Sequence, residues 1–207
     1  MARRRVVITG LGIVSPVGNT VEEAWQNILA GKSGISAVTK FDTSTFRVQF
    51  AGEVKNFDIT QYISAKDARR MDDFIHFGLA AGIQAVRDAG LDKEGTADPE
   101  RVGVAIGSGI GGLPLIEATK DEYSAGGVRK VSPFFVPGSI INMISGNLSI
   151  EFGFKGPNIA LVSACTTGTH SIGDAARIIE YGDADVMVAG GAESTVSPLG
   201  MGGFCAA

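Results

Sequence analysis

The segment from Asn158 to Gly168 reads Asn-Ile-Ala-Leu-Val-Ser-Ala-Cys-Thr-Thr-Gly. Its apolar run, Ile159 to Val162, is typical of a buried strand, and a helical pattern over Thr166 to Tyr181 follows and ends at a glycine. The turn between the two is short and contains Cys165. A strand that passes directly into a helix is the repeating unit of α/β folds, so this segment predicts that fold class.

The rest of the chain repeats the same alternation of strand and helix. Three further apolar runs predict buried strands over Arg5 to Thr9, Val102 to Ile106 and Asp185 to Ala189. Helical patterns lie over Thr20 to Ala30, which opens with a capping box, and over Asp73 to Ala89. Alternation of this kind predicts a mixed, mostly parallel sheet with helices on its faces.

Two segments are less regular. Residues Phe41 to Tyr62 are compatible with two short strands or with an irregular loop. Residues Gly202 to Ala207 are apolar and glycine-rich, so we expect no terminal helix there and interpret the chain as one half of something larger.

Composition and charge exclude several classes of protein. With 207 residues, 44% hydrophobic and 19% charged, the chain can bury a sizeable core, and its net charge of −4 argues against a dedicated nucleic-acid binder. No apolar run is long enough to cross a membrane. The two cysteines, Cys165 and Cys205, cannot form a disulfide framework, so we expect a cytoplasmic protein. Because His76 and His170 are not at ligand spacing from them, we expect no metal site.

Cys165 is the strongest candidate for chemistry. At the start of a helix, unpaired N–H groups and the positive end of the helix dipole stabilise a thiolate, which is the nucleophilic form of cysteine. The alternative is a small cysteine packed in the core, and the seven-residue spacing to Ile172 favours a position at the head of the buried stripe, away from open solvent. His170 lies about 140° around the helix, so it is a poor candidate for a catalytic partner.

A competing motif is Gly107-Ser108-Gly109-Ile110-Gly111-Gly112, which matches the dinucleotide fingerprint G-x-G-x-x-G after a strand. The acidic residue expected some 20 residues later is missing, because 124–130 reads Ser-Ala-Gly-Gly-Val-Arg-Lys. The motif also follows the second predicted strand instead of the first. A nicotinamide-dependent dehydrogenase therefore remains the weaker alternative.

Basic side chains gather in two places on this acidic chain. A predicted N-cap at Ser64 precedes one group, which shares a helix face by its spacing. These charges form either a solvated face or a docking surface for an acidic partner. The two groups are Lys66, Arg69 and Arg70, and then Arg129 with Lys130.

Five segments in a fixed order resemble a known family. The chain is similar over essentially all of residues 1–207 to the N-terminal half of the β-ketoacyl-[acyl-carrier-protein] synthases, in particular synthase II of bacterial fatty-acid biosynthesis. The segments that carry the resemblance are 7–18 (Val-Ile-Thr-Gly-Leu-Gly-Ile-Val-Ser-Pro-Val-Gly), 107–112, 133–137 (Pro-Phe-Phe-Val-Pro), 164–168 (Ala-Cys-Thr-Thr-Gly) and 189–193 (Ala-Gly-Gly-Ala-Glu).

The resemblance implies a fold and an activity. The fold is thiolase-like, with this chain as one half of a five-layer αβαβα architecture that forms a homodimer. The activity is acyl transfer from acyl-carrier protein to Cys165, followed by decarboxylative Claisen condensation with malonyl-acyl-carrier protein to give 3-ketoacyl-acyl-carrier protein. No cofactor is implied, since the substrates are carried on the phosphopantetheine of the carrier protein.

The resemblance also assigns roles to residues by position. Ile110 matches the gate of the acyl pocket, and Gly200 and Phe204 match further residues that line it. Phe135 matches a residue that one subunit contributes to the acyl pocket of its partner. The N–H of Cys165 matches one oxyanion donor. Both basic groups match positions where the family docks its acidic carrier protein.

One departure is large. The family's two catalytic histidines, its lysine and its second oxyanion donor lie in a C-terminal half that this chain lacks, and neither His76 nor His170 matches them. We therefore expect residues 1–207 alone to be inactive in condensation. A non-catalytic partner subunit of a condensing enzyme remains an alternative, although the retained Cys165 argues against it.

Overall fold

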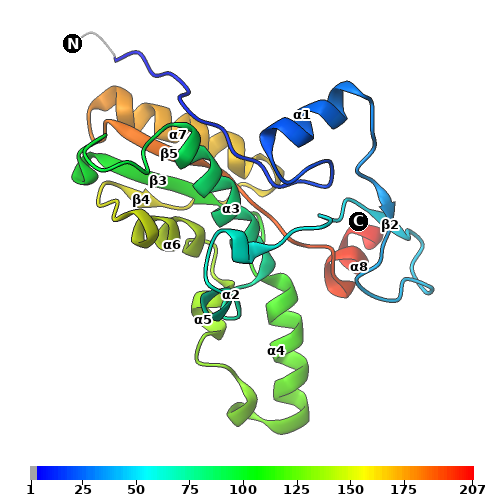
Figure 1. The fold of residues 1–207 in the computed structure, drawn as a ribbon. Helices are drawn as coiled ribbons and strands as arrows, with labels where there is room; N and C mark the ends of the chain where they lie inside the picture. Colours follow the sequence, from blue (N-terminus) through cyan, green and yellow to red (C-terminus); the bar gives the residue numbers. More distant parts are fainter. Residues whose placement is uncertain (1–3) are drawn as a thin grey trace.

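The computed structural model describes residues 4–207 and is built around one parallel sheet. Its strand order is β4 (Asn158–Ile159), β3 (Val102–Gly107) and β5 (Val186–Gly191), with β3 in the centre and all three strands parallel. Their carboxyl ends therefore meet at one edge of the sheet (Figure 1). This α/β arrangement confirms the predicted fold class.

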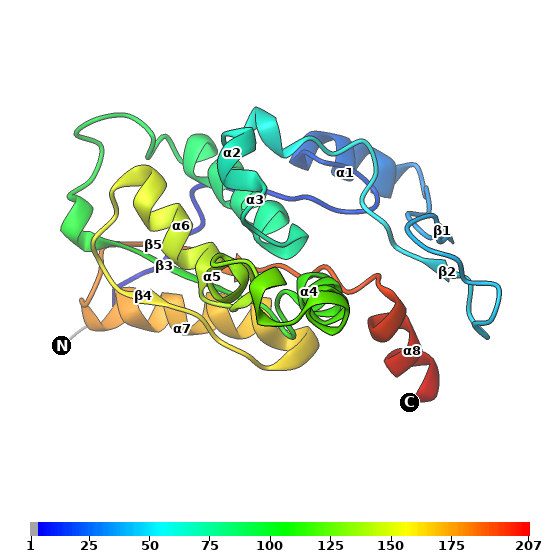
Figure 2. The same ribbon diagram turned by 90° about the horizontal axis from the view of Figure 1, so that it is seen from below.

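Helices cover both faces of the sheet. Helix α7 (Thr167–Tyr181) lies on one face, and α3 (Asp73–Asp88) with α6 (Met143–Phe152) lies on the other (Figure 2). The three layers correspond to one α/β/α half of the predicted architecture. The ranges predicted for α3 and α7 are confirmed to within a residue or two.

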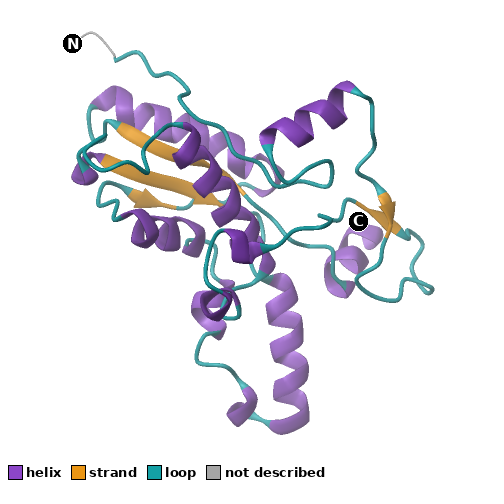
Figure 3. Ribbon diagram, in the orientation of Figure 1, coloured by secondary structure: helices purple, strands orange, loops and turns teal. Residues whose placement is uncertain are grey.

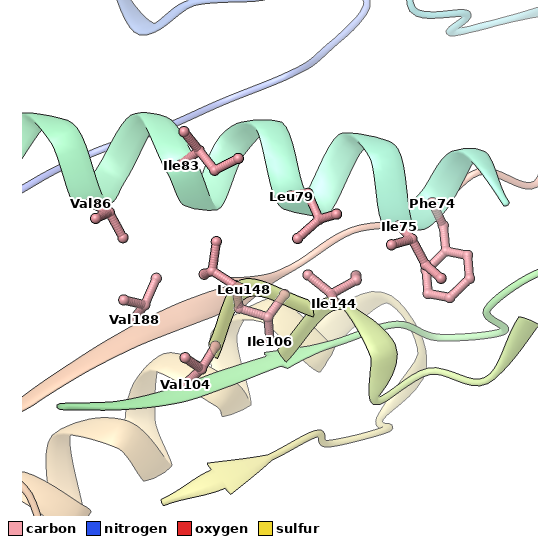
Figure 4. Close-up of a cluster of buried hydrophobic side chains, with 10 residues drawn as sticks. All are labelled: Phe74, Ile75, Leu79, Ile83, Val86, Val104, Ile106, Ile144, Leu148 and Val188. Carbon is pink, nitrogen blue, oxygen red and sulfur yellow. The ribbon is translucent and has the colours of Figure 1, made fainter. Parts of the chain in front are cut away.

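The core fills the space between the sheet and the layer of α3 and α6 (Figure 4). Two glycines of α3 make the close packing possible. A Cβ on Gly78 would stand 2.6 Å from Ile144 Cδ1, and one on Gly82 would stand 2.9 Å from Leu148 Cδ2, so the bare backbone lets α6 approach. The buried cluster consists of Phe74, Ile75, Leu79, Ile83, Val86, Val104, Ile106, Ile144, Leu148 and Val188.

The other elements surround this unit, and α4 projects away from the sheet (Figures 1 and 3). A short antiparallel pair, β1 with β2, stands apart from the main sheet. In chain order the remaining elements are α1 (Val21–Leu29), β1 (Ser36–Ala37), β2 (Phe50–Ala51), η1 (Ile59–Gln61), α2 (Ala65–Ala68), η2 (Pro99–Arg101), α4 (Leu113–Gly126), η3 (Val128–Lys130), α5 (Phe135–Ser139), η4 (Ala164–Thr166) and α8 (Pro198–Ala206).

The predicted strand over Arg5 to Thr9 is wrong for this structure. The segment is extended but makes no ladder, and Val7 and Ile8 are 62% and 78% exposed. A groove of about 320 Å³ separates it from β5 and α7. Strands pair only when their axes lie about 5 Å apart, so across this groove the hydrogen bonds of a ladder cannot form.

Three smaller predictions also need correction. The strand predicted over Ile159 to Val162 shrinks to β4, because the chain leaves the sheet early to form the turn before α7. The segment 41–62 holds a single short strand, β2, whose partner β1 precedes the segment. The chain does end in a helix, α8, which Ser197 caps and Pro198 opens; the glycines do not prevent it.

Candidate active site

A strained turn positions Cys165 at the start of α7. Ala164, the residue before it, has φ +52°, a left-handed conformation that costs free energy in a residue with a side chain. Side-chain hydrogen bonds hold the turn. Thr166 Oγ1 donates to the Ser163 carbonyl at 2.6 Å, and Thr167 Oγ1 accepts from the Ser163 N–H at 2.9 Å.

Cys165 itself is exposed, and its backbone N–H finds no hydrogen-bond acceptor within residues 4–207. The expectation that Cys165 is shielded at the head of a buried stripe is wrong. Cys165 lies in η4, before the α-helical spacing begins at Thr167, so its direction does not follow from its spacing to Ile172. Ile172 is itself 53% exposed. The accessible thiol and the free N–H are the two features that a nucleophile with an oxyanion donor requires.

Within residues 4–207, neither His76 nor His170 forms a hydrogen bond with the thiol of Cys165. Nδ1 of His170 lies 2.6 Å from the hydroxyl of Ser163. His76 is on α3, where Nε2 donates to the Ala68 carbonyl at 2.9 Å and Nδ1 lies 3.4 Å from Asp73. Burial lowers the pKa of His76, but these two hydrogen bonds outweigh it and hold the pKa above the ordinary value of 6.5. Both ring nitrogens of His76 thus have partners within the fold, which is typical of a structural histidine.

The glycine loop after β3 carries Ile110, the predicted gate, which is 46% exposed. The carboxylate of Glu193 accepts hydrogen bonds from the N–H groups of Ile110 and Gly111. In a dinucleotide site, free N–H groups of such a loop bind the phosphates. Here a side chain of the protein already uses them, which argues against the dehydrogenase alternative.

The loop also approaches the elbow of Cys165. A Cβ on Gly109 would stand 3.4 Å from Ala164 Cα, which is van der Waals contact distance. On its other side the loop contacts α5, because the Gly112 N–H donates to the Ser139 carbonyl at 3.0 Å. Phe135, half-buried, begins α5. The fold thus connects the segments of Cys165, Ile110 and Phe135.

The other two predicted pocket residues lie on α8, which stands apart from the sheet (Figures 1 and 2). Gly200 is buried, and a Cβ there would clash with the Thr195 carbonyl oxygen. Phe204 is 66% exposed. Helix α8 is attached to α4 by Glu117, whose Oε1 accepts from the Ser197 hydroxyl at 2.8 Å and from the Leu199 N–H at 2.9 Å.

The basic groups lie on short elements outside the sheet. Helix α2 ends at Ala68, so Lys66 is in the helix while Arg69 and Arg70 follow it. The guanidinium of Arg70 stands 4.4 Å from the centre of the Phe134 ring, and Arg70 also pairs with Asp67 at 3.7 Å. Arg129 and Lys130 lie in η3, the short helix that follows α4, and Phe134 lies four residues after η3 ends.

No helix within residues 4–207 is both long enough and apolar enough to cross a bilayer. In the same range, no three His, Cys, Asp or Glu side chains are grouped so that they could hold a metal ion.

Comparison with known proteins shows the family to which the chain belongs. The family model of the β-ketoacyl synthase N-terminal domain matches residues 3–207. The chain belongs to this family. Among its relatives are the 3-oxoacyl-[acyl-carrier-protein] synthases 2 of Vibrio cholerae, 62% identical, and of Coxiella burnetii, 55% identical. Each comparison covers 100% of the chain but 50% of the relative, so this synthase domain spans about half the length of those proteins.

Solved structures show the same fold. The ishigamide ketosynthase/chain length factor aligns with a TM-score of 0.89 at 28% identity, over 99% of this synthase domain and 51% of that chain. A type II polyketide ketosynthase in complex with its acyl-carrier protein aligns with a TM-score of 0.81 at 27% identity, over 99% of the domain and 55% of that chain. The thiolase-like fold is therefore confirmed.

Sequence reasoning missed two carboxylates that hold the site together, Glu193 and Glu117. Each caps N–H groups of a segment that carries a predicted pocket residue. Glu193 belongs to 189–193, one of the five segments that carry the family resemblance. Its hydrogen-bond partners, however, are more than 80 residues away, and no local pattern indicates such a contact.

Proposed function

We propose that this domain takes up an acyl group on Cys165 as the first half-reaction of a β-ketoacyl-[acyl-carrier-protein] synthase. The observation that supports it is the exposed thiol beside a free N–H at the start of α7. The thiolate attacks the carbonyl carbon of an acyl thioester, and the N–H of Cys165 stabilises the oxyanion. The thioester bond to the carrier then breaks, and its phosphopantetheine thiol leaves and takes up the proton.

The second half-reaction is condensation. Malonyl-acyl-carrier protein loses CO₂, its carbanion attacks the Cys165 thioester, and the thiolate is expelled as 3-ketoacyl-acyl-carrier protein forms. We propose that this step needs the full-length protein, with residues 1–207 as its N-terminal half. The reaction needs no cofactor beyond the carrier's phosphopantetheine, and we place it in the cytoplasm.

The proposed partners are acyl-carrier protein and a second copy of the synthase. The positive side chains on and after α2 and on η3 suit an acidic carrier, since an otherwise acidic protein gains association rate from such a patch. A ketosynthase of the same fold has been solved in complex with its carrier protein. In the dimer we assign Phe135 to the pocket of the partner subunit.

The test is the intact mass of the protein after incubation with hexanoyl-acyl-carrier protein. We expect one hexanoyl group on Cys165, none on the Cys165→Ala variant, and an unchanged result for Cys205→Ser, the matched cysteine control. Acylation of the Cys165→Ala variant, or none of the wild type in its full-length form, would overturn the proposal. With malonyl-acyl-carrier protein added, only the full-length protein should release 3-ketoacyl product.

A further inference from the structure

The carboxylate of Glu193 anchors the loop that carries Ile110. Its Oε2 accepts from the Ile110 N–H at 2.9 Å, and its Oε1 accepts from the Ser108 hydroxyl at 2.9 Å and from the Gly111 N–H at 3.3 Å. The Ser108 hydroxyl oxygen in turn accepts from the Gly111 N–H at 3.1 Å. Both carboxylate oxygens are thus committed to one loop.

This loop needs such an anchor because its sequence supplies little stiffness. Three of its five residues, 108–112, are glycines, and Gly111 has φ +83°, a conformation that few other residues adopt. Glycine loops lose much conformational entropy when they are fixed in one geometry. Hydrogen bonds to a charged acceptor are stronger than neutral ones and offset that loss.

The same carboxylate stands close to the elbow of the nucleophile. A Cβ on Gly109 would lie 2.7 Å from Glu193 Oε2 and 3.4 Å from Ala164 Cα. Glu193 itself lies two residues after the end of β5, the strand that packs against α7. The side chain of Glu193 therefore fixes the backbone of the gate next to the turn of Cys165.

We propose that Glu193 is a positioning residue that sets the acyl-chain preference of the synthase by fixing the backbone at Ile110. The proposal rests on the proposed function and on the role of acyl-pocket gate that the family resemblance implies for Ile110. Glu193 touches no reacting atom. Its effect reaches the substrate through the position of the Ile110 side chain.

The isosteric variant Glu193→Gln separates this role from general packing. An amide has one oxygen acceptor, and its NH₂ group faces an N–H donor if it takes the place of the second oxygen. The variant must therefore lose the bond from the Ile110 N–H or the bond from the Gly111 N–H, whereas the Ser108 hydroxyl can accept from the amide NH₂ instead. The matched control is Glu122→Gln, which removes one carboxylate from the exposed surface of α4.

Two readouts on the full-length protein test the proposal. The first is hydrogen exchange of the loop amides, which we expect to accelerate about tenfold in Glu193→Gln because a charge-assisted bond is lost. The second is the ratio of acylation rates of Cys165 with hexanoyl- and tetradecanoyl-acyl-carrier protein, which we expect to change about fivefold because small displacements at a gate alter rates strongly. Glu122→Gln should leave both unchanged.

Alkylation of Cys165 by iodoacetamide supplies the control for a merely structural effect, since this small reagent needs no acyl pocket. An unchanged acylation ratio in Glu193→Gln, or an equal loss of alkylation and of both acylation rates, would overturn the role of Glu193 while the proposed function stands. A wild-type protein that accepts no acyl group at all would overturn the proposed function and this proposal with it.

Discussion

Gly191, the last residue of β5, lies against Gly168 in the first turn of α7 so closely that a Cβ on Gly191 would stand 3.0 Å from Gly168 Cα. Gly168 Cα is a backbone atom, so it cannot move aside alone. A Cβ on Gly168 would meet nothing nearer than 3.4 Å, an ordinary contact. The end of β5 therefore supports the turn that holds Cys165. Of the two glycines at this contact, Gly191 is the one that leaves less room for a side chain.

We expect Gly191→Ala to push the first turn of α7 off the sheet. The free energy of unfolding should fall by about 1–3 kcal/mol, as overpacking of a close contact does. Alkylation of Cys165 should slow, because the helix start no longer stabilises the thiolate in place. Urea denaturation and the rate of reaction with iodoacetamide measure the two effects.

The matched control is Gly190→Ala, one residue earlier, where a Cβ would meet no atom within 4 Å. It should leave both quantities close to wild type. Equal behaviour of the two variants would show that the contact with Gly168 does not support the turn.

Because Asp185 is hydrogen-bonded to two arginines, we expect the free energy of unfolding to fall in acid. Hydrogen bonds from Arg101, and then from Arg4, hold its pKa down to about 2. The folded pKa lies below that of the unfolded chain, so the carboxylate stabilises the fold above about pH 4 and loses this effect as the pH falls towards about 2. The urea midpoint of the wild type should fall through this window.

The comparison is with Asp185→Asn, which should have a lower midpoint at neutral pH and converge with the wild type in acid. Asp92→Asn, an exposed carboxylate in a loop, is the control. A gap between wild type and Asp185→Asn that stays constant from neutral pH to acid would contradict the assignment.

The sequence predicted those elements whose signals are local. The helices α3 and α7 have apolar spacing, a capping residue or a terminal glycine, and these interactions span only a few residues. The strands β3 and β5 are continuous apolar runs, as buried parallel strands are. The position of Cys165 between strand and helix followed from these same signals.

Features that depend on distant partners were not predictable in this way. The run from Arg5 to Thr9 has the composition of a strand, yet pairing depends on the spacing to β5, which no local pattern encodes. The exposure of Cys165 depends on the 3₁₀ geometry of η4 and the positive φ of Ala164. The anchoring of the Ile110 loop depends on Glu193, more than 80 residues later.

His76 provides a test of the electrostatics on α3. Replacing Asp73 by Asn removes the carboxylate that faces Nδ1, so the pKa of His76 should fall towards or below 6.5. The imidazole proton shifts in an NMR titration report it, and Asp121→Asn on α4 should have no effect. A pKa that stays high in Asp73→Asn would contradict the role of this carboxylate.

The same shift has a consequence for stability. Because the folded pKa of His76 is raised, its charged form stabilises the fold below about pH 6.5 and this contribution is lost as the pH rises through the folded value. This dependence of the free energy of unfolding on pH should be present in the wild type and reduced in Asp73→Asn. Urea midpoints between slightly acidic and alkaline pH measure it.

Glu117 should hold α8 to α4 through a single oxygen. Both donors, the Ser197 hydroxyl and the Leu199 N–H, bind Oε1, so a glutamine can keep both bonds through its own carbonyl oxygen. We therefore expect Glu117→Ala to cost about 1–2 kcal/mol, as the loss of a helix cap does. Glu117→Gln should restore most of it.

Limited proteolysis separates local release of α8 from global unfolding. In Glu117→Ala, cleavage within 198–206 should accelerate, while the core helices α3 and α6 stay protected, because α8 lies outside the buried cluster. Equal protection of α8 in Glu117→Ala and wild type would mean that other contacts hold this helix. Equal sensitivity of Glu117→Gln and Glu117→Ala would mean that the charge, and not the shared oxygen, makes the attachment.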